Sequence, residues 1–390
     1  MLLVLSVSPS SVSFSNSNYN YTNTNTNVCS HLCKICSIDL ANMAKNHHHL
    51  MSVGIRPPAG GWRKRSFKAK AMKRFGNLYH QIYSYENLEL ADTIASKGKS
   101  KQPDVIAHQM NKDANILMLH DQLKGKTYKT SEYTTFTIFE PKERIIFRLP
   151  YFPDRITHHA VMNVLEPVFV SIFTTDTYSC IKGRGIHAAL RAVKTALKDT
   201  ASTQYCLKLD IRKFYPTIDH TILKQLLRRK IKDKDLLWLM DEIIDSSAGL
   251  PIGNYLSQYF ANFYLTGFDH WMKETKRVKY YFRYADDMVI LAANKPELHQ
   301  LLSDIRTYMS EKLKLDVKDN YQVFPVDDRG IDFVGYVFHH THIRLRKRIK
   351  QRFARMISCN KNNQSIASYK GWAKHCNSKH LIKKLLYEKL

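Results

Sequence analysis

The fold of this chain is decided by the stretch Tyr280-Tyr281-Phe282-Arg283-Tyr284-Ala285-Asp286-Asp287-Met288-Val289-Ile290-Leu291-Ala292. Aromatic, β-branched and other apolar residues flank its Ala-Asp-Asp centre, which predicts a β-hairpin with buried strands and two carboxylates at the turn. A lone Asp-Asp pair is usually only a solvated turn. However, the apolar run that starts at Tyr205 also ends in a carboxylate, that of Asp210, so the pair has a third acidic neighbour to consider.

The candidate catalytic residues are Asp210, Asp286 and Asp287. If the strand of Asp210 lies beside the hairpin, three carboxylates meet at one sheet edge, where they repel one another unless cations lie between them. Carboxylate oxygens on rigid strands suit two Mg²⁺ ions about 4 Å apart. Such ions activate an attacking hydroxyl and stabilise the leaving oxygen in phosphoryl transfer, so the pattern predicts nucleotidyl transfer.

Composition favours a nucleic-acid partner. The 390 residues include 60 Lys and Arg against 34 Asp and Glu, a net charge of +26. Phosphate backbones favour such a surface because binding releases counterions; a merely soluble basic protein is the alternative. The seven cysteines are thinly spread and odd in number, which disfavours a disulfide framework and fits a reducing cytoplasm. No apolar run reaches the length of about 18 residues that a membrane span requires.

The first 71 residues are expected to be a low-complexity, disordered extension, because they are rich in Ser, Asn, Thr and His without a hydrophobic period. Later methionines up to Met72 offer other starts, so this segment fits an upstream extension of the reading frame. Cysteines between residues 29 and 36 have only loosely zinc-like spacing. The basic arm from Trp62 to Arg74 has two interpretations: a segment that binds RNA, or a run of solvated charges that binds nothing.

Basic residues beside turns are candidate phosphate contacts. A strand-turn-strand is expected over residues 133–149, where Lys142 and Arg144 are placed to grip a nucleotide triphosphate, although cations on a hairpin are often only solubilising. Lys182 and Arg184 alternate with glycines just before an expected helix, a position that favours a phosphate or template contact.

Two further segments are predicted to contact an incoming nucleotide. Tyr215 lies five residues past Asp210, where its ring would lie under the sugar and exclude a 2′-hydroxyl; a buried core tyrosine is the alternative. Residues 249–258 contain two glycines around a Pro-Ile pair, which predicts a loop whose backbone approaches a nucleotide or base pair. That loop includes Ile252 and Gly253.

The C-terminal part is strongly basic. From Arg344 onward there are fourteen Lys or Arg and one acidic residue, Glu388, and apolar residues recur at helical spacing. A helical segment that grips a nucleic-acid duplex is therefore expected, with a basic surface helix that binds nothing as the alternative. The candidate contacts are Arg346, Arg348 and Arg352.

In order and spacing these motifs resemble those of the reverse transcriptases of bacteria and their mobile elements, over about residues 73–358. The tetrapeptide Tyr284-Ala285-Asp286-Asp287 resembles the family signature. The segment from Leu209 to Tyr215 resembles the strand with the first metal ligand and the sugar gate. Residues 144–163 and 182–190 resemble the motifs of the fingers. The segment Phe333-Val334-Gly335-Tyr336 resembles the primer grip, and its candidate contact residues are Phe333, Gly335 and Tyr336.

The resemblance implies an α+β right-hand polymerase with fingers (residues 72–200), a catalytic palm of ferredoxin-like topology (201–336) and a short basic helical thumb (337–390). It further implies that Asp210 and Asp286 hold two Mg²⁺ ions, with Asp287 supporting them and the Ile211 carbonyl contributing. Arg144 and Lys142 would neutralise the β- and γ-phosphates of a dNTP. Lys318 would be the proton donor to pyrophosphate.

The stretch Ile252-Gly253-Asn254-Tyr255-Leu256-Ser257-Gln258 is similar to that of diversity-generating retroelement enzymes. This implies copying of a template-repeat RNA into cDNA with errors opposite adenines, and a small basic oligomeric accessory protein as partner. Ile252, Gln258 and Arg144 would border the nascent base pair loosely. A cytoplasmic, bacterial or phage-encoded enzyme is expected, which holds an RNA/cDNA duplex. The length argues against a maturase with an endonuclease tail.

The alternatives are a retron, antiphage or group II intron-like reverse transcriptase, and a non-catalytic basic RNA-binding protein with a polymerase fold. Intact acids at positions 210, 286 and 287 argue against the non-catalytic protein.

Overall fold

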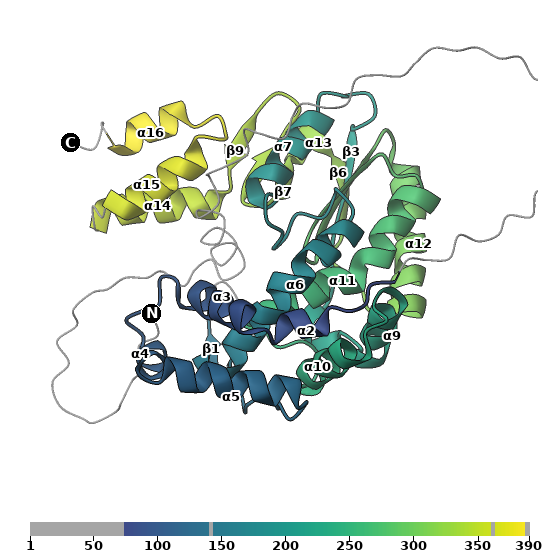
Figure 1. The fold of residues 1–390 in the computed structure, drawn as a ribbon. Helices are drawn as coiled ribbons and strands as arrows, with labels where there is room; N and C mark the ends of the chain where they lie inside the picture. The colour runs from purple at the N-terminus through teal and green to yellow at the C-terminus, as the bar shows by residue number, and fades with distance from the viewer. Residues whose placement is uncertain (1–73, 140–142, 360–362, 387–390) are drawn as a thin grey trace, which may run out of the picture.

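The computed structural model describes residues 74–139, 143–359 and 363–386 (Figure 1). An antiparallel sheet with the strand order β4-β5-β3-β6 lies at its centre. This order places the first strand of the sheet between the third and the fourth, as in a ferredoxin-like fold. The strands are β3 (Tyr205–Asp210), β4 (Tyr280–Tyr284), β5 (Asp287–Ala292) and β6 (Gln322–Pro325).

The period-two pattern of these strands places alternate side chains in two separate cores. Leu207 and Ile290 belong to the larger core, which α11 (Tyr255–His270) and α12 (Lys295–Leu313) also line. On the opposite face, Cys206 and Val289 belong to a second core with α7 (Ile186–Ala196). The sheet is therefore buried on both faces, which explains the nearly continuous apolar runs in its sequence.

Local capping fixes several helix starts around the sheet. The Asn294 side chain accepts a hydrogen bond from Glu297 N at 3.0 Å, so α12 begins where the Asn, Pro and Glu pattern predicts. Asp219 and Asp233 cap α9 (His220–Lys230) and α10 (Lys234–Asp245) in the same way. The remaining helical turns of this region are α8 (Phe214–Thr217) and the π-helical η2 (Trp271–Thr275), which follows α11.

The N-terminal helices pack on the larger core at one end of the molecule (Figure 1). Residues 103–124 form two helices rather than one, because Asn111 leaves the helical conformation at φ −129° and ψ 33°. The helix that contains Pro167 continues past this residue. The elements are α2 (Tyr79–Ile82), α3 (Tyr85–Ser96), α4 (Pro103–Met110), α5 (Lys112–Lys124), β1 (Thr134–Ile138), β2 (Arg144–Arg148), η1 (Tyr151–Arg155) and α6 (Ile156–Ile172).

A second antiparallel sheet, β7-β8-β9, precedes the C-terminal helices. The boundary expected between residues 336 and 337 falls inside β8, since this sheet joins residues on both sides of it. Phe353, Ile357 and Leu385 form a small core among the C-terminal helices. The elements are α13 (Val326–Arg329), β7 (Ile331–Phe333), β8 (Tyr336–Phe338), β9 (Ile343–Leu345), α14 (Lys347–Cys359), α15 (Asn363–Ala373) and α16 (Lys379–Leu386).

The described segment between α12 and β6 forms no regular strand. Lys314 adopts φ 50° at the end of α12, and Val317 makes only an isolated bridge with Ile211 before β6 begins.

The α+β class and the ferredoxin-like sheet order are confirmed, as expected for a right-hand polymerase fold. Among the described residues, Cys180, Cys206 and Cys376 form no disulfide bond, and no described helix has the length and apolar character to cross a membrane.

Candidate active site

Three carboxylates lie at one edge of the central sheet. Tyr284 pairs with Asp287 across the hairpin β4–β5, and Asp287 pairs in turn with Asp210 on β3. Asp286 therefore lies at the turn. Ala285, which precedes it, has φ 55°, a left-handed conformation that costs a non-glycine residue about 1–2 kcal/mol. The sheet thus brings together the acids that the sequence predicted to be neighbours.

The pKa values of these acids indicate mutual repulsion. Burial, followed by the nearby Asp210 carboxylate, raises the pKa of Asp286 to about 7, while the backbone N–H of Asp286 opposes the shift. Burial raises the pKa of Asp287 to about 6; Lys208 opposes the increase and Asp210 adds to it. Both shifts favour the protonated forms at this edge. A cation bound between these carboxylates would reduce their repulsion.

Two lysines contact the acids. Lys318 Nζ lies 2.5 Å from Asp210 Oδ2, and the backbone N–H of Lys318 donates to the Asp210 carbonyl at 2.9 Å. Lys208 Nζ lies 3.6 Å from Asp287 Oδ1 and also donates to the carbonyl of Asp332. Asp287 is therefore directed toward Lys208, whereas the main carboxylate neighbour of Asp286 is Asp210.

The acids fit Mg²⁺ as a pair of ligands rather than as a complete cage. Within residues 74–139, 143–359 and 363–386, no group of three His, Cys, Asp or Glu side chains is arranged to hold a metal ion. However, Asp210 Oδ1 and Asp287 Oδ1 are buried and accept no hydrogen bond from the described residues. Mg²⁺ usually takes one or two carboxylates and completes its octahedron with water and substrate phosphates. Asp210 and Asp286 would supply that pair.

The residues after Asp210 connect this edge to the predicted nucleotide loop. Ile211 is fully buried as a whole residue, and it forms an isolated bridge with Val317. Tyr215 is half-buried in α8, and its carbonyl accepts a hydrogen bond from Leu250 N at 2.9 Å. The predicted sugar gate and the Gly249–Gln258 segment are therefore directly joined.

The other end of that segment contacts the β1–β2 hairpin. Phe147 N donates to the Ile252 carbonyl at 2.8 Å. Gly253 has φ 126°, and a Cβ there would come within 2.2 Å of the Phe147 carbonyl oxygen, so only glycine fits. Arg144 begins the same strand as Phe147, and Gln258 is half-buried near the start of α11. The loop thus joins the hairpin to the region of Tyr215.

The remaining predicted phosphate contacts are placed differently. Lys142 lies outside the described residues. Lys182 is exposed in the turn before α7. Arg184, half-buried beside it, donates to the carbonyls of Thr174 and Thr177, the second at 3.1 Å. Its guanidinium therefore supports the preceding loop.

The residues that resemble a primer grip are covered by the C-terminal helices. Phe333 and Tyr336 are fully buried. Gly335 has φ 91°, and a Cβ there would lie 2.4 Å from the ring of Trp372 on α15. The Tyr336 hydroxyl donates to the Trp372 carbonyl at 3.0 Å. The rings of Phe333 and Tyr336 therefore pack inward, and the primer grip at this turn stays a prediction.

The expected duplex contacts form a cationic groove at the start of α14. The groove has a volume of about 530 Å³. It lies close to the acids, since Arg346 Nε is 2.5 Å from Asp332 Oδ1 and Lys208, which contacts Asp287, donates to the Asp332 carbonyl. Its lining residues are Arg346, Lys347, Arg348, Gln351, Arg352 and Arg355.

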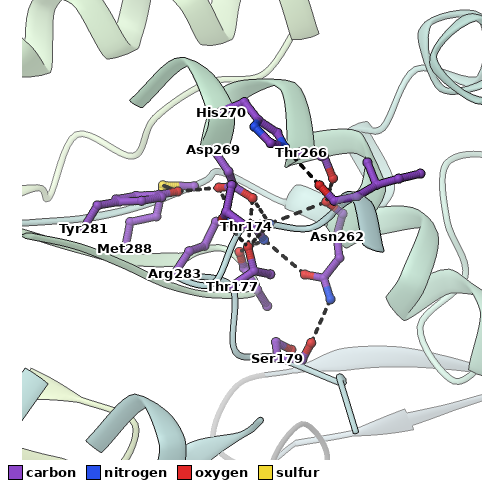
Figure 2. A network of polar contacts seen from close by, with 12 residues as sticks. Thr174, Thr177, Ser179, Asn262, Thr266, Asp269, His270, Tyr281, Arg283 and Met288 are labelled. Carbon is purple, nitrogen blue, oxygen red and sulfur yellow. Dashed lines mark hydrogen bonds and ion pairs between the residues drawn. The ribbon is translucent and has the colours of Figure 1, made fainter. Parts of the chain in front are cut away.

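Sequence reasoning missed a buried polar network directly behind the Asp286 turn (Figure 2). Arg283 on β4 and Asp269 on α11 are both fully buried and form an ion pair. The available signal was a basic residue in the middle of an apolar strand, Tyr281 to Tyr284, where a charge requires a buried partner.

Comparisons with known proteins show the family of the chain. The sequence profile of the reverse transcriptase (RNA-dependent DNA polymerase) family matches residues 140–338, just over half of the chain. Protein YkfC of Escherichia coli (strain K12) is 25% identical over 255 residues, which cover 54% of this chain and 65% of YkfC. The group II intron-encoded protein LtrA of Lactococcus lactis subsp. cremoris is 24% identical over 261 residues, which cover 48% of this chain and 43% of LtrA.

Among solved structures, telomerase from Candida albicans in complex with the TWJ fragment of telomeric RNA matches with a TM-score of 0.44 and 12% identity, over 61% of this chain and 52% of the telomerase chain. The chain spans less than two thirds of the length of each of these proteins. The family profile covers β3, the Asp286 hairpin and the sheet that holds them. The chain belongs to the reverse transcriptase (RNA-dependent DNA polymerase) family.

Proposed function

We propose that the chain catalyses RNA-directed DNA polymerisation by nucleotidyl transfer. The observation that carries this proposal is the gathering of three carboxylates at the sheet edge: Asp210 pairs with Asp287 in the sheet, Asp286 lies at the adjoining turn, and Asp210 Oδ1 is buried without a hydrogen bond from the described residues. Both Mg²⁺ ions would be held by these two carboxylates, with Asp287 behind them. When bound, Mg²⁺ supplies an activated primer hydroxyl and neutralises charge on the reacting phosphates.

The chain's own residues would orient the other reactants. Tyr215 would lie against the sugar of an incoming dNTP, and Arg144 would neutralise its terminal phosphates. Lys318, already in contact with Asp210, would donate a proton to the leaving pyrophosphate. The cationic groove of α14 would hold the phosphate backbone of the template RNA and cDNA duplex through Arg348, Arg352 and their neighbours.

Primer extension tests this proposal. The purified full chain is given an RNA template with an annealed DNA primer, dNTPs and Mg²⁺, and full-length cDNA is expected. Asp210→Asn keeps the size of the side chain but loses its charge, so it is expected to give no product while binding the template as well as the unchanged chain does. A wild-type chain that binds the duplex but never extends the primer would leave only a nucleic-acid-binding protein.

The finer proposal is that the enzyme belongs to a diversity-generating retroelement and copies a template-repeat RNA with errors opposite adenines. It is supported by the loop sequence from Ile252 to Gln258 and by the contact of that loop with the hairpin of Arg144. A small basic oligomeric accessory protein is the proposed partner. Sequencing of cDNA made from templates of matched composition tests the error pattern. Ile252 and Gln258 variants with an unchanged error spectrum would remove their role.

A second candidate is a group II intron-like reverse transcriptase, favoured by the similarity to LtrA. It differs in its RNA partner rather than in its chemistry. A splicing assay with a flanking intron RNA separates the two: promotion of splicing by the purified protein supports the intron-type enzyme, whereas adenine-directed errors without splicing support the retroelement enzyme.

A further inference from the structure

Arg283 is a charged residue in the interior of the palm. Its side chain and that of Asp269 both have 0% exposure. Arg283 Nε lies 2.7 Å from Asp269 Oδ1, and a second guanidinium nitrogen lies 2.5 Å from Asp269 Oδ2, so the pair is bidentate. Figure 2 shows this pair at the centre of a network that joins β4, α11 and the 174–179 segment.

The network holds each of its members from several sides. Asp269 also accepts hydrogen bonds from the Tyr281 hydroxyl at 2.7 Å and from the Thr177 hydroxyl at 3.0 Å. Arg283 Nη1 donates to Asn262 Oδ1 at 3.1 Å, and the amide nitrogen of Asn262 donates to the Ser179 carbonyl at 2.8 Å. The guanidinium of Arg283 is therefore fixed in one orientation.

One arm of this fixed guanidinium reaches the turn that carries Asp286. Arg283 Nη1 donates to the Ala285 carbonyl at 3.0 Å. That carbonyl belongs to the same planar peptide unit as the backbone N–H of Asp286. The peptide unit that leads into Asp286 is thus held at its oxygen by Arg283.

Stability alone gives weak grounds for a buried charge at position 283. A buried ion pair is often no more stabilising than well-packed apolar residues of the same size. Ala285, by contrast, adopts a left-handed conformation at φ 55° that a non-glycine residue avoids unless its surroundings impose it. The bond from Arg283 to the Ala285 carbonyl is a contact that imposes this conformation.

We propose that Arg283 is a positioning residue for the Asp286 carboxylate and that Asp269 and Asn262 hold its guanidinium for this purpose. The inference rests on the proposed function, in which Asp286 holds a divalent cation. Residues that orient a metal ligand typically change metal affinity about 10–100-fold when they are altered. Loss of the Ala285 contact is therefore expected to weaken cation binding in addition to reducing stability.

Binding of Mn²⁺ to the full chain, followed by electron paramagnetic resonance without substrates, tests this directly. Arg283→Lys keeps a positive charge beside Asp269 but has a single nitrogen and cannot also reach Ala285 and Asn262. It is expected to weaken Mn²⁺ binding about 10-fold and to raise the Mg²⁺ concentration for half-maximal primer extension by a similar factor. Tyr281→Phe is the matched control, since it removes a hydrogen bond to Asp269 without touching Ala285, and Mn²⁺ affinity should stay within about twofold.

Asp286→Asn must abolish the binding of Mn²⁺ to the chain. If Mn²⁺ still binds, it occupies another site and the proposal fails. Wild-type Mn²⁺ affinity in a folded Arg283→Lys variant also overturns it. If that variant does not fold, Asn262→Ala decides, because it removes the second acceptor of Arg283 Nη1 and the bond to the Ser179 carbonyl but leaves the ion pair with Asp269 in place: weakened Mn²⁺ binding supports the proposal and unchanged binding overturns it. A wild-type chain that binds Mn²⁺ through Asp286 but makes no cDNA contradicts the proposed function and leaves the positioning role intact.

Discussion

The hairpin β4–β5 carries two charged residues that are treated in opposite ways. Arg283 is fully buried, and its partners on α11 and the 174–179 segment satisfy it. Asp286, three residues further on, is half-buried, and its main charged neighbour is another acid, Asp210. The difference teaches that the protein itself supplies every partner of the first charge. The second is arranged for a ligand, since two facing carboxylates cannot both stay ionised without a cation between them.

The largest expected effect is on catalysis and distinguishes the two acids of the hairpin, Asp286 and Asp287. Asp286→Asn should lower the rate of primer extension about 10,000-fold, as for loss of a central catalytic group. Asp287→Asn should lower it only about 10–100-fold, because Asp287 is directed toward Lys208 and acts behind the proposed ligands. Single-turnover rates on one primer and template measure both. Equal losses would place Asp287 among the direct ligands and end this distinction.

Substitutions in the network around Arg283 should reduce the stability of the folded protein. Asp269→Ala leaves the Arg283 charge buried without its partner and should reduce the free energy of unfolding by about 3–5 kcal/mol. Asp241→Ala breaks the surface pair with Arg228 and should cost less than about 1 kcal/mol, which makes it the matched control. Urea unfolding measures both variants. Similar losses would show that Asp269 is no more important to the fold than a surface acid.

The pH dependence of stability should reveal the repulsion at Asp286. Folding raises the pKa of this acid from 3.8 to about 7 through burial and then Asp210. The folded state therefore binds more protons than the unfolded state between these values, and stability falls as the pH rises through this window. Without divalent ions, the Tm of the wild type should decrease relative to Asp286→Asn from about pH 4 to pH 7, at about 2 °C per kcal/mol.

Mg²⁺ should reverse this relative decrease in the wild type and have no such effect on Asp286→Asn, because a bound cation removes the repulsion. A difference in Tm that stays constant across the pH range would show that folding leaves the proton affinity of Asp286 unchanged.

The smallest expected effect concerns the cationic groove. Arg355→Gln should reduce the slope of log affinity against log salt by about 0.9 for an RNA/DNA duplex, through the loss of one phosphate contact. Arg229→Gln, on α9 at a distance from α14 (Figure 1), should leave the slope unchanged. Fluorescence anisotropy at several salt concentrations measures the slope. An unchanged slope for Arg355→Gln would place the duplex elsewhere.

Much of the candidate site was predictable because its signals are local. Alternating apolar residues around Ala285 indicated the hairpin, and Asp210 ended an apolar run just as Asp287 began one. The glycine at position 253 is explained by the close approach of Phe147, which the sequence indicated only as a loop near a ligand. The burial of the turn around Gly335 could not be predicted locally, since the helix of Trp372 that covers it begins about thirty residues later.

The sequence by itself determined the strand pattern, the acidic turn and the basic C-terminal segment, because backbone sterics impose a period of two on strands and turn chemistry depends on adjacent residues. Only the tertiary structure decided which charges find partners. Asp210 meets Lys318 across 108 residues of chain, and Asp269 meets Arg283 from a different element. Such partnerships depend on how helices and strands pack together in three dimensions, and packing is not encoded in any local spacing.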